Sequence, residues 1–146
     1  MANEWTLLVE QEPPVPMTVA NGTGIEKGTF LRLFEPNTAS HALGTGKPMA
    51  GVAASEKIAN DGNTTIGVYR KGIFRATASG AITAGDALQY APGVGAGGDG
   101  GLASYANTVM AIPGYSVSTA ASFGGVIGRA METAADADTF RLHLNI

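Results

Sequence analysis

Residues 24–33, GIEKGTFLRL, and residues 81–90, AITAGDALQY, share one pattern: isoleucine is followed three positions later by glycine and six positions later by leucine. Two later pairs of segments repeat in the same order. MAGVAASE (49–56) parallels GVIGRAMET (125–133), and NTTIGVYR (63–70) parallels DTFRLHL (138–144). A turn–strand unit used twice predicts an all-β scaffold of short strands.

The composition fits one domain with an unusually uncharged surface. Of the 146 residues, 14% are charged, against about 25% in an ordinary soluble domain. Glycine occurs 21 times and cysteine is absent, so disulfide and zinc–thiolate sites are excluded. The low charge predicts that other subunits cover much of the surface. The alternative is a monomer coated with uncharged threonine, serine and glycine.

The charge balance also limits the partners. The net charge is −3, and the nine lysines and arginines are scattered along the chain. Direct binding of nucleic acid needs a basic stripe, so we expect none. The N-terminus resembles no secretory signal, and no apolar run of about 18 residues predicts a membrane span.

The N-terminal segment combines an apolar strand with prolines. EWTLLVE (4–10) reads as a strand, and three prolines follow within residues 13–16. Prolines in this number favour an extended tether, because they cannot sustain a sheet ladder. We therefore predict an extended arm over 1–16 and a single β-domain over 17–146. The alternative is a first strand tucked back onto its own sheet, since Trp5, Leu7 and Val9 form an alternating apolar face that favours burial.

The rest of the chain alternates short strands with turns, which predicts a small β-barrel or a sandwich. We expect a polar loop over 35–47 and a glycine-rich loop over 92–104, with its densest glycines at 92–101. Residues 134–138 are compatible with one helical turn. No longer amphipathic helix is predicted.

No cluster of residues predicts catalysis or a metal site. The two histidines, His41 and His143, have no evident partners in the sequence. The glycine-rich run lacks the Lys-Ser/Thr of a phosphate loop, and Asp61-Gly62-Asn63 is explained by turn chemistry. We expect no enzymatic activity and no cofactor.

The order of turn–strand units resembles the capsid decoration (cement, head-stabilising) proteins of tailed bacteriophages. The likeness covers residues 17–91 and, more loosely, 123–144. The segments that carry it are Val19–Gly22, Ile25–Gly28, Phe30–Leu33, Pro48–Ala53, Ile66–Gly72 and Ala81–Leu88.

The resemblance implies a β-barrel-like or β-tulip-like body and a homotrimer at three-fold sites. It places the protein on the outer capsid surface of the virion, where it binds the major capsid protein and stabilises the expanded head. No catalytic residue is implied. The predicted arm would add a strand to a neighbouring sheet edge and contact the capsid protein. The candidate contact residues are Trp5, Leu7, Leu8, Val9, Val15 and Pro16.

Two other functions stay open at this point. A carbohydrate- or receptor-binding β-module on a phage particle would use Tyr90, Tyr105 and Tyr115 as stacking surfaces. A small β-barrel enzyme would require a pocket in which polar groups converge with His41 or His143.

Overall fold

The computed structural model describes residues 4–41, 49–90, 108–111 and 127–146, and over these ranges it consists of strands and turns without a helix. This confirms the predicted all-β fold. The strands are β1 (Thr6–Glu10), β2 (Val15–Thr18), β3 (Phe30–Glu35), β4 (Thr38–His41), β5 (Met49–Ala53), β6 (Thr65–Tyr69), β7 (Lys71–Ala78), β8 (Ala87–Tyr90), β9 (Thr108–Ala111), β10 (Gly128–Ala130) and β11 (Thr139–Asn145).

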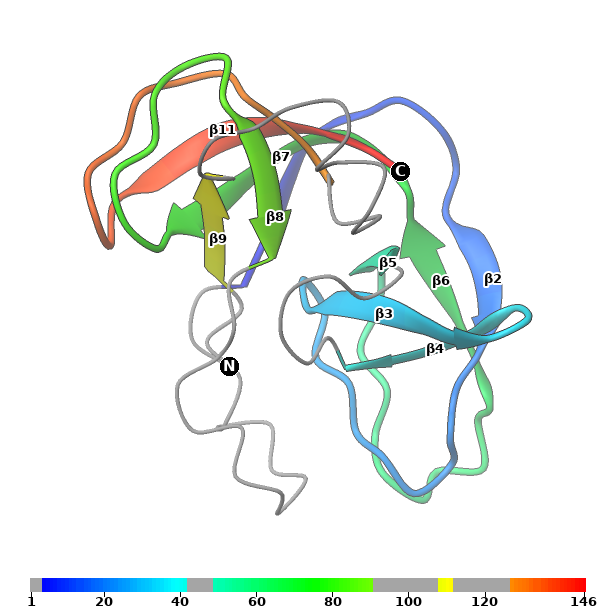
Figure 1. The fold of residues 1–146 in the computed structure, drawn as a ribbon. Coiled ribbons are helices and arrows are strands. Elements are labelled where there is room, and N and C mark those ends of the chain that lie inside the picture. The colour runs from blue at the N-terminus through cyan, green and yellow to red at the C-terminus, as the bar shows by residue number, and fades with distance from the viewer. Residues whose placement is uncertain (1–3, 42–48, 91–107, 112–126) are drawn as a thin grey trace.

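The strands form two small rings that lie side by side (Figure 1). The first barrel is closed in the order β2-β4-β3-β5-β6. The second sheet has the order β1-β7-β11-β10-β8-β9, and a further pairing of β7 with β9 closes its last five strands into a second barrel.

The two barrels have the same topology. Strands β2 to β6 correspond in order to β7 to β11. In each barrel the first and third strands meet as a parallel pair, through Thr18 and Thr38 in one and through Thr77 and Thr108 in the other. The remaining pairs are antiparallel. The repeat read from the sequence is therefore a repeat of structure.

The repeated glycine has one structural role in both copies. Gly28 and Gly85 have φ angles of +83° and +91°, which favour glycine. The amide of Gly28 donates to the carbonyl of Ala53, and the amide of Gly85 donates to that of Ala130. Each glycine thus turns the chain into the second strand of its barrel, β3 or β8, while it stays bonded to the neighbouring strand, β5 or β10.

Each barrel encloses apolar side chains, and one of the two clusters extends between the barrels. The smaller cluster lies inside the first barrel and includes Leu31, Ile66 and Val68. The larger cluster fills the second barrel and also contains Trp5, Phe30, Met49 and Val52. Because Phe30 and Val52 belong to first-barrel strands, the larger cluster joins the two barrels into one apolar body.

The N-terminal strand does not project from the body, which corrects the predicted arm. β1 pairs antiparallel with β7, with Thr6 opposite Arg75 and Val9 opposite Ile73. Trp5 and Leu7 of the alternating apolar face pack in the larger cluster, whereas the register shift between Leu7 and Val9 leaves Val9 on the exposed side. Gln11–Pro14 then lead from β1 to β2 of the first barrel. Val15 and Pro16, assigned to the arm, lie in β2 of the first barrel.

Two local predictions are also wrong. Residues 38–41, expected in a polar loop, form β4, because they complete the first ring between β2 and β3. Residues 134–138 form no helical turn: Ala134 makes a bridge with Ile82, and Ala137 has a φ angle of +68°, which a right-handed helix excludes. The glycine-rich loop, 92–104, lies outside the described residues.

Candidate functional site

The six residues predicted to contact a capsid protein do not share one surface. Trp5 is buried, with 4% of its surface exposed, and Leu7 packs partly buried against the larger core. Val15 packs against the core of the first barrel, and Pro16 is exposed in β2. Leu8 and Val9 are 41% and 49% exposed. The assignment of Trp5 as an exposed anchor is therefore wrong, whereas Leu8, Val9 and Pro16 are accessible.

Trp5 joins the two barrels. Its ring centre lies 4.9 Å from that of Phe30 in β3 and 6.1 Å from that of Phe74 in β7. Its amide donates a 3.0 Å hydrogen bond to the carbonyl of Gly28, while the strand that follows it pairs with β7. A single residue thus contacts the first barrel through its backbone and both barrels through its ring.

The outer face of the second barrel is accessible and cationic. Four adjacent strands, β1, β7, β11 and β10, align two rows of side chains, because residues directly opposite in a sheet share a face. One row runs Val9, Ile73, His143, Arg129, and the other runs Thr6, Arg75, Arg141. We call these seven residues the outer face.

Three of the nine lysines and arginines of the chain lie on the outer face, and all three are exposed. Arg141 is paired with Glu132 at 2.7 Å, and this side-chain hydrogen bond, together with one from the backbone of Arg141, lowers the pKa of the Glu132 carboxyl. A hollow of about 280 Å³ beside the rows is lined by Gly128, Arg129, His143 and Asn145. The arginines of this arrangement suit an anionic group.

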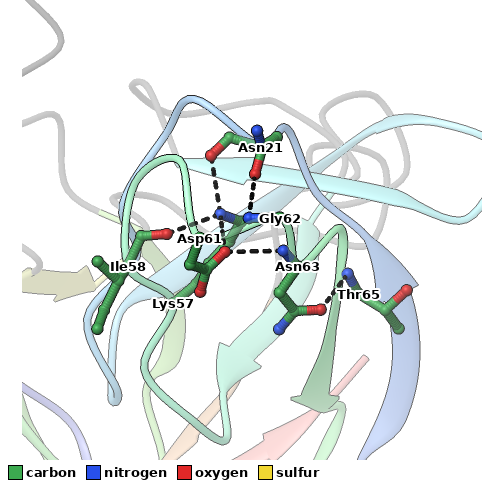
Figure 2. Close-up of polar contacts among 7 residues, drawn as sticks. All are labelled: Asn21, Lys57, Ile58, Asp61, Gly62, Asn63 and Thr65. Carbon is green, nitrogen blue, oxygen red and sulfur yellow. Dashed lines mark hydrogen bonds and ion pairs between the residues drawn. The ribbon is translucent and has the colours of Figure 1, made fainter.

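A buried lysine closes one end of the first barrel (Figure 2). The side chain of Lys57 is fully buried, and its Nζ donates to the carbonyls of Asn21 and Ile58 and to Oδ1 of Asp61, at 2.9, 3.0 and 3.2 Å. The backbone amide of Asn63 also donates to Asp61 and is the main cause that lowers the pKa of this carboxyl. All three donors of the ammonium group are satisfied, so Lys57 is a structural residue.

The described part of the chain contains no group of three or more potential metal ligands. His143 Nε2 lies 2.7 Å from Oε1 of Gln11 and contacts the tether between β1 and β2. His41 ends β4. The two histidines are on different barrels and are not brought together.

A second hollow lies on the first barrel. It has a volume of about 470 Å³, and its lining includes Thr18, Arg32, Phe34 and Ser40. Phe34 is 60% exposed, and the Arg32 guanidinium lies 5.1 Å from the centre of its ring. Arg32 also donates to the hydroxyl of Ser40, so the rim of this hollow is held by side-chain contacts.

Of the tyrosines considered as stacking surfaces, one lies within the described residues. Tyr90 ends β8, and Tyr105 and Tyr115 lie outside the described residues.

No family model matches the sequence, and no curated protein matches it. Among solved structures, the chain is similar to the crystal structure of the head fiber gp8.5 N base of bacteriophage phi29. The TM-score is 0.53 and the identity is 17%, over 90% of this chain and 93% of that one. The likeness shows a shared all-β fold. In the described residues, no helix is long and apolar enough to cross a membrane.

Sequence reasoning missed both Lys57 and the outer face. The repeat contains a signal for Lys57. Ile25 makes an isolated bridge with Lys57, and the corresponding Ile82 makes one with Ala134, so Lys57 and Ala134 occupy the same position of the repeat. A lysine in one copy at a position that is a small apolar residue in the other indicates a special role. The outer face has no such local signal, because strand pairing assembles it from four separate segments.

Proposed function

We propose that the chain is a capsid decoration protein, which binds the outer surface of a phage head as a homotrimer at three-fold sites and stabilises the expanded shell. The observation that carries the proposal is the fold shared with the phi29 head fiber base, over nearly the whole of both chains. The order of turn–strand units, which resembles decoration proteins, supports it independently of that fold match.

The surface composition supports a partner that covers a large area of this protein. Only 14% of the residues are charged, and several large apolar side chains are exposed. They include Leu8, Val9, Phe34, Ile58 and Met131. Apolar side chains at a protein surface favour association when they are covered by a partner. The partner we propose is the major capsid protein, with other copies of the chain as the second contact.

A trimer would strengthen modest contacts. Three equivalent surfaces on one particle bind a lattice with an effective concentration set by their spacing, so a weak single contact gives stable decoration. Closed cyclic symmetry is also the usual result of self-association.

The role we propose is structural and not catalytic. The polar side chains best placed to act chemically have structural partners: Lys57 closes the first barrel, and His143 contacts Gln11. The proposal includes no cofactor.

Binding to purified heads tests this function. The purified chain is mixed with empty expanded heads and with unexpanded heads, and the pelleted fraction is measured as a function of concentration. We expect saturable binding to expanded heads and a higher temperature of head disruption. In solution, sedimentation equilibrium should give three times the chain mass of 14.8 kDa. Absence of binding to expanded heads would refute the proposal, and a monomer in solution would refute the trimer.

A further inference from the structure

The repeat makes it possible to compare one face on the two barrels. In the first barrel, Phe30 pairs with Val52 and Val52 pairs with Tyr69. In the second, Ala87 pairs with Arg129 and Arg129 pairs with His143. The two rows occupy corresponding strands. Next to each row lies a glycine that pairs with a leucine: Gly51 with Leu31 on the first barrel and Gly128 with Leu88 on the second. The face is therefore the same part of the fold.

On the first barrel this face is covered by the chain itself. Phe30 and Val52 are buried in the larger cluster, in which the ring of Trp5 lies against that of Phe30, and Tyr69 packs edge-on against Phe74 with ring centres 5.9 Å apart. The covering segment also bonds to the turn glycine, because the amide of Trp5 donates to the carbonyl of Gly28. In this fold, the face is thus a packing surface, covered on the first barrel by the Trp5 segment and by Phe74 of the second barrel.

On the second barrel the same face has different chemistry. Arg129 and His143 stand where the first barrel has Val52 and Tyr69, and Arg129 is exposed. The carbonyl of Gly85, which corresponds to Gly28, accepts a 3.2 Å hydrogen bond from Nη1 of Arg129. The carbonyl of Gly85 is therefore bonded to an arginine side chain, whereas the corresponding carbonyl of Gly28 is bonded to the backbone amide of Trp5.

The charges around this face select the occupant. Arg75, Arg129 and Arg141 lie on the outer face, with Glu132 as the acid bonded to Arg141. The hollow is lined by Arg129, His143 and Asn145, and the arginine guanidinium matches a carboxylate, whereas Nε2 of His143 already contacts Gln11. At its other end the row is apolar, since Val9 is 49% exposed and lies opposite Ile73. An acidic segment with a neighbouring apolar residue complements both ends.

We propose that the outer face, centred on Arg129 and His143, is the surface that docks on a carboxylate-bearing segment of the major capsid protein. This inference rests on the proposed function, whose partner contact it specifies. It replaces the predicted arm with a sheet face to which β1 contributes Val9.

Charge variants of the full chain test the proposal on empty expanded heads. Arg129→Glu should weaken binding at least about tenfold, because it places a carboxylate against a carboxylate. Lys27→Glu makes the same change in net charge at an exposed position of the first barrel and should change the dissociation constant less than about threefold. Glu132→Gln removes an acid beside the face and should strengthen binding. Arg129→Lys should retain more affinity than Arg129→Glu.

The outcomes separate this inference from the proposed function. If the unaltered chain does not bind heads, the proposed function fails and the inference with it. If the unaltered chain binds and Arg129→Glu, still folded by circular dichroism, binds equally well, the function stands and the inference is overturned. It is also overturned if Arg129→Glu changes the sedimentation mass, because the occupant is then a second copy. If Arg129→Glu does not fold, Arg129→Gln takes its place, with a weaker salt dependence of binding as the expected result.

Discussion

The backbone amide of Trp5 donates to the carbonyl of Gly28, and the backbone of Trp5 lies so close to Gly28 that no side chain fits between them. A methyl group at Gly28 would lie 2.6 Å from the carbonyl oxygen of Trp5. A methyl group at Gly85, the corresponding position of the second barrel, would meet no described atom of a non-neighbouring residue within 4 Å. One repeated glycine is thus an ordinary turn residue, and the other is also the docking point of the N-terminal segment.

This difference predicts unequal effects of one substitution. Gly85→Ala should lower the free energy of unfolding by about 1 kcal/mol, because alanine is strained at a positive φ angle. Gly28→Ala has the same strain and also displaces Trp5, so its loss should be larger by about 2 kcal/mol or more. Urea unfolding of both variants measures the difference. Equal losses would show that the Trp5 contact contributes little to stability.

The buried position of Trp5 predicts a large effect of its removal. Trp5→Ala should lower the free energy of unfolding by about 3–5 kcal/mol, the usual range for a buried large aromatic residue. Leu8→Ala, at a 41% exposed position of the same strand, should change it by less than about 0.5 kcal/mol. A chain lacking residues 1–10 should likewise be unstable, because β7 loses a partner strand. A truncated chain as stable as the full chain would instead support the interpretation of residues 1–16 as a projecting arm.

Replacement of the buried lysine tests the closure of the first barrel. Lys57→Met should lower the free energy of unfolding by about 1–3 kcal/mol, since the carbonyls of Asn21 and Ile58 lose their donor. Lys27→Met, at an exposed position, is the matched control and should change stability by less than about 0.5 kcal/mol. The corresponding Ala134 shows that the fold accepts an apolar residue here, so Lys57→Met should still fold. An unchanged unfolding midpoint would mean that water replaces the ammonium group without cost.

Two carboxylates predict a loss of stability in acid. The pKa of Asp61 is lowered from 3.8, chiefly by the amide of Asn63, and the pKa of Glu132 is lowered from 4.5, chiefly by the side chain of Arg141. Each anion is favoured by folding, so its contribution is present above these ordinary values and is lost as pH falls through the lower folded-state pKa. The urea midpoint should therefore fall below about pH 4.5. Asp61→Asn and Glu132→Gln should each reduce this pH dependence, and an undiminished slope in both variants would contradict the assignment.

Much of the fold was predictable because the repeat reports it directly. The pairs Ile25/Ile82, Gly28/Gly85 and Leu31/Leu88 occupy corresponding positions of the two barrels. The short strands between glycine-containing turns predicted the all-β fold correctly. The strand order within each barrel was not predictable, because the parallel pairs Thr18/Thr38 and Thr77/Thr108 join strands that are not consecutive in the sequence.

The candidate site was predicted less well, for a physical reason. A proline-rich segment permits both a projecting arm and a crossing between barrels, and the contacts of Trp5 with Gly28, Phe30 and Phe74 decide between them. These contacts come from both barrels, so no single stretch of the sequence reports them. The outer face likewise combines residues as distant as Val9 and Arg129, which strand pairing brings onto one surface.

The most direct measurement for the proposed function is cryo-electron microscopy of expanded heads saturated with the chain. The account predicts three copies at each three-fold site on the outer surface, with β10 and β11 of the second barrel toward the shell. Bare heads at saturating concentration would contradict the capsid role, and density that contacts the shell through the first barrel alone would contradict the docking face.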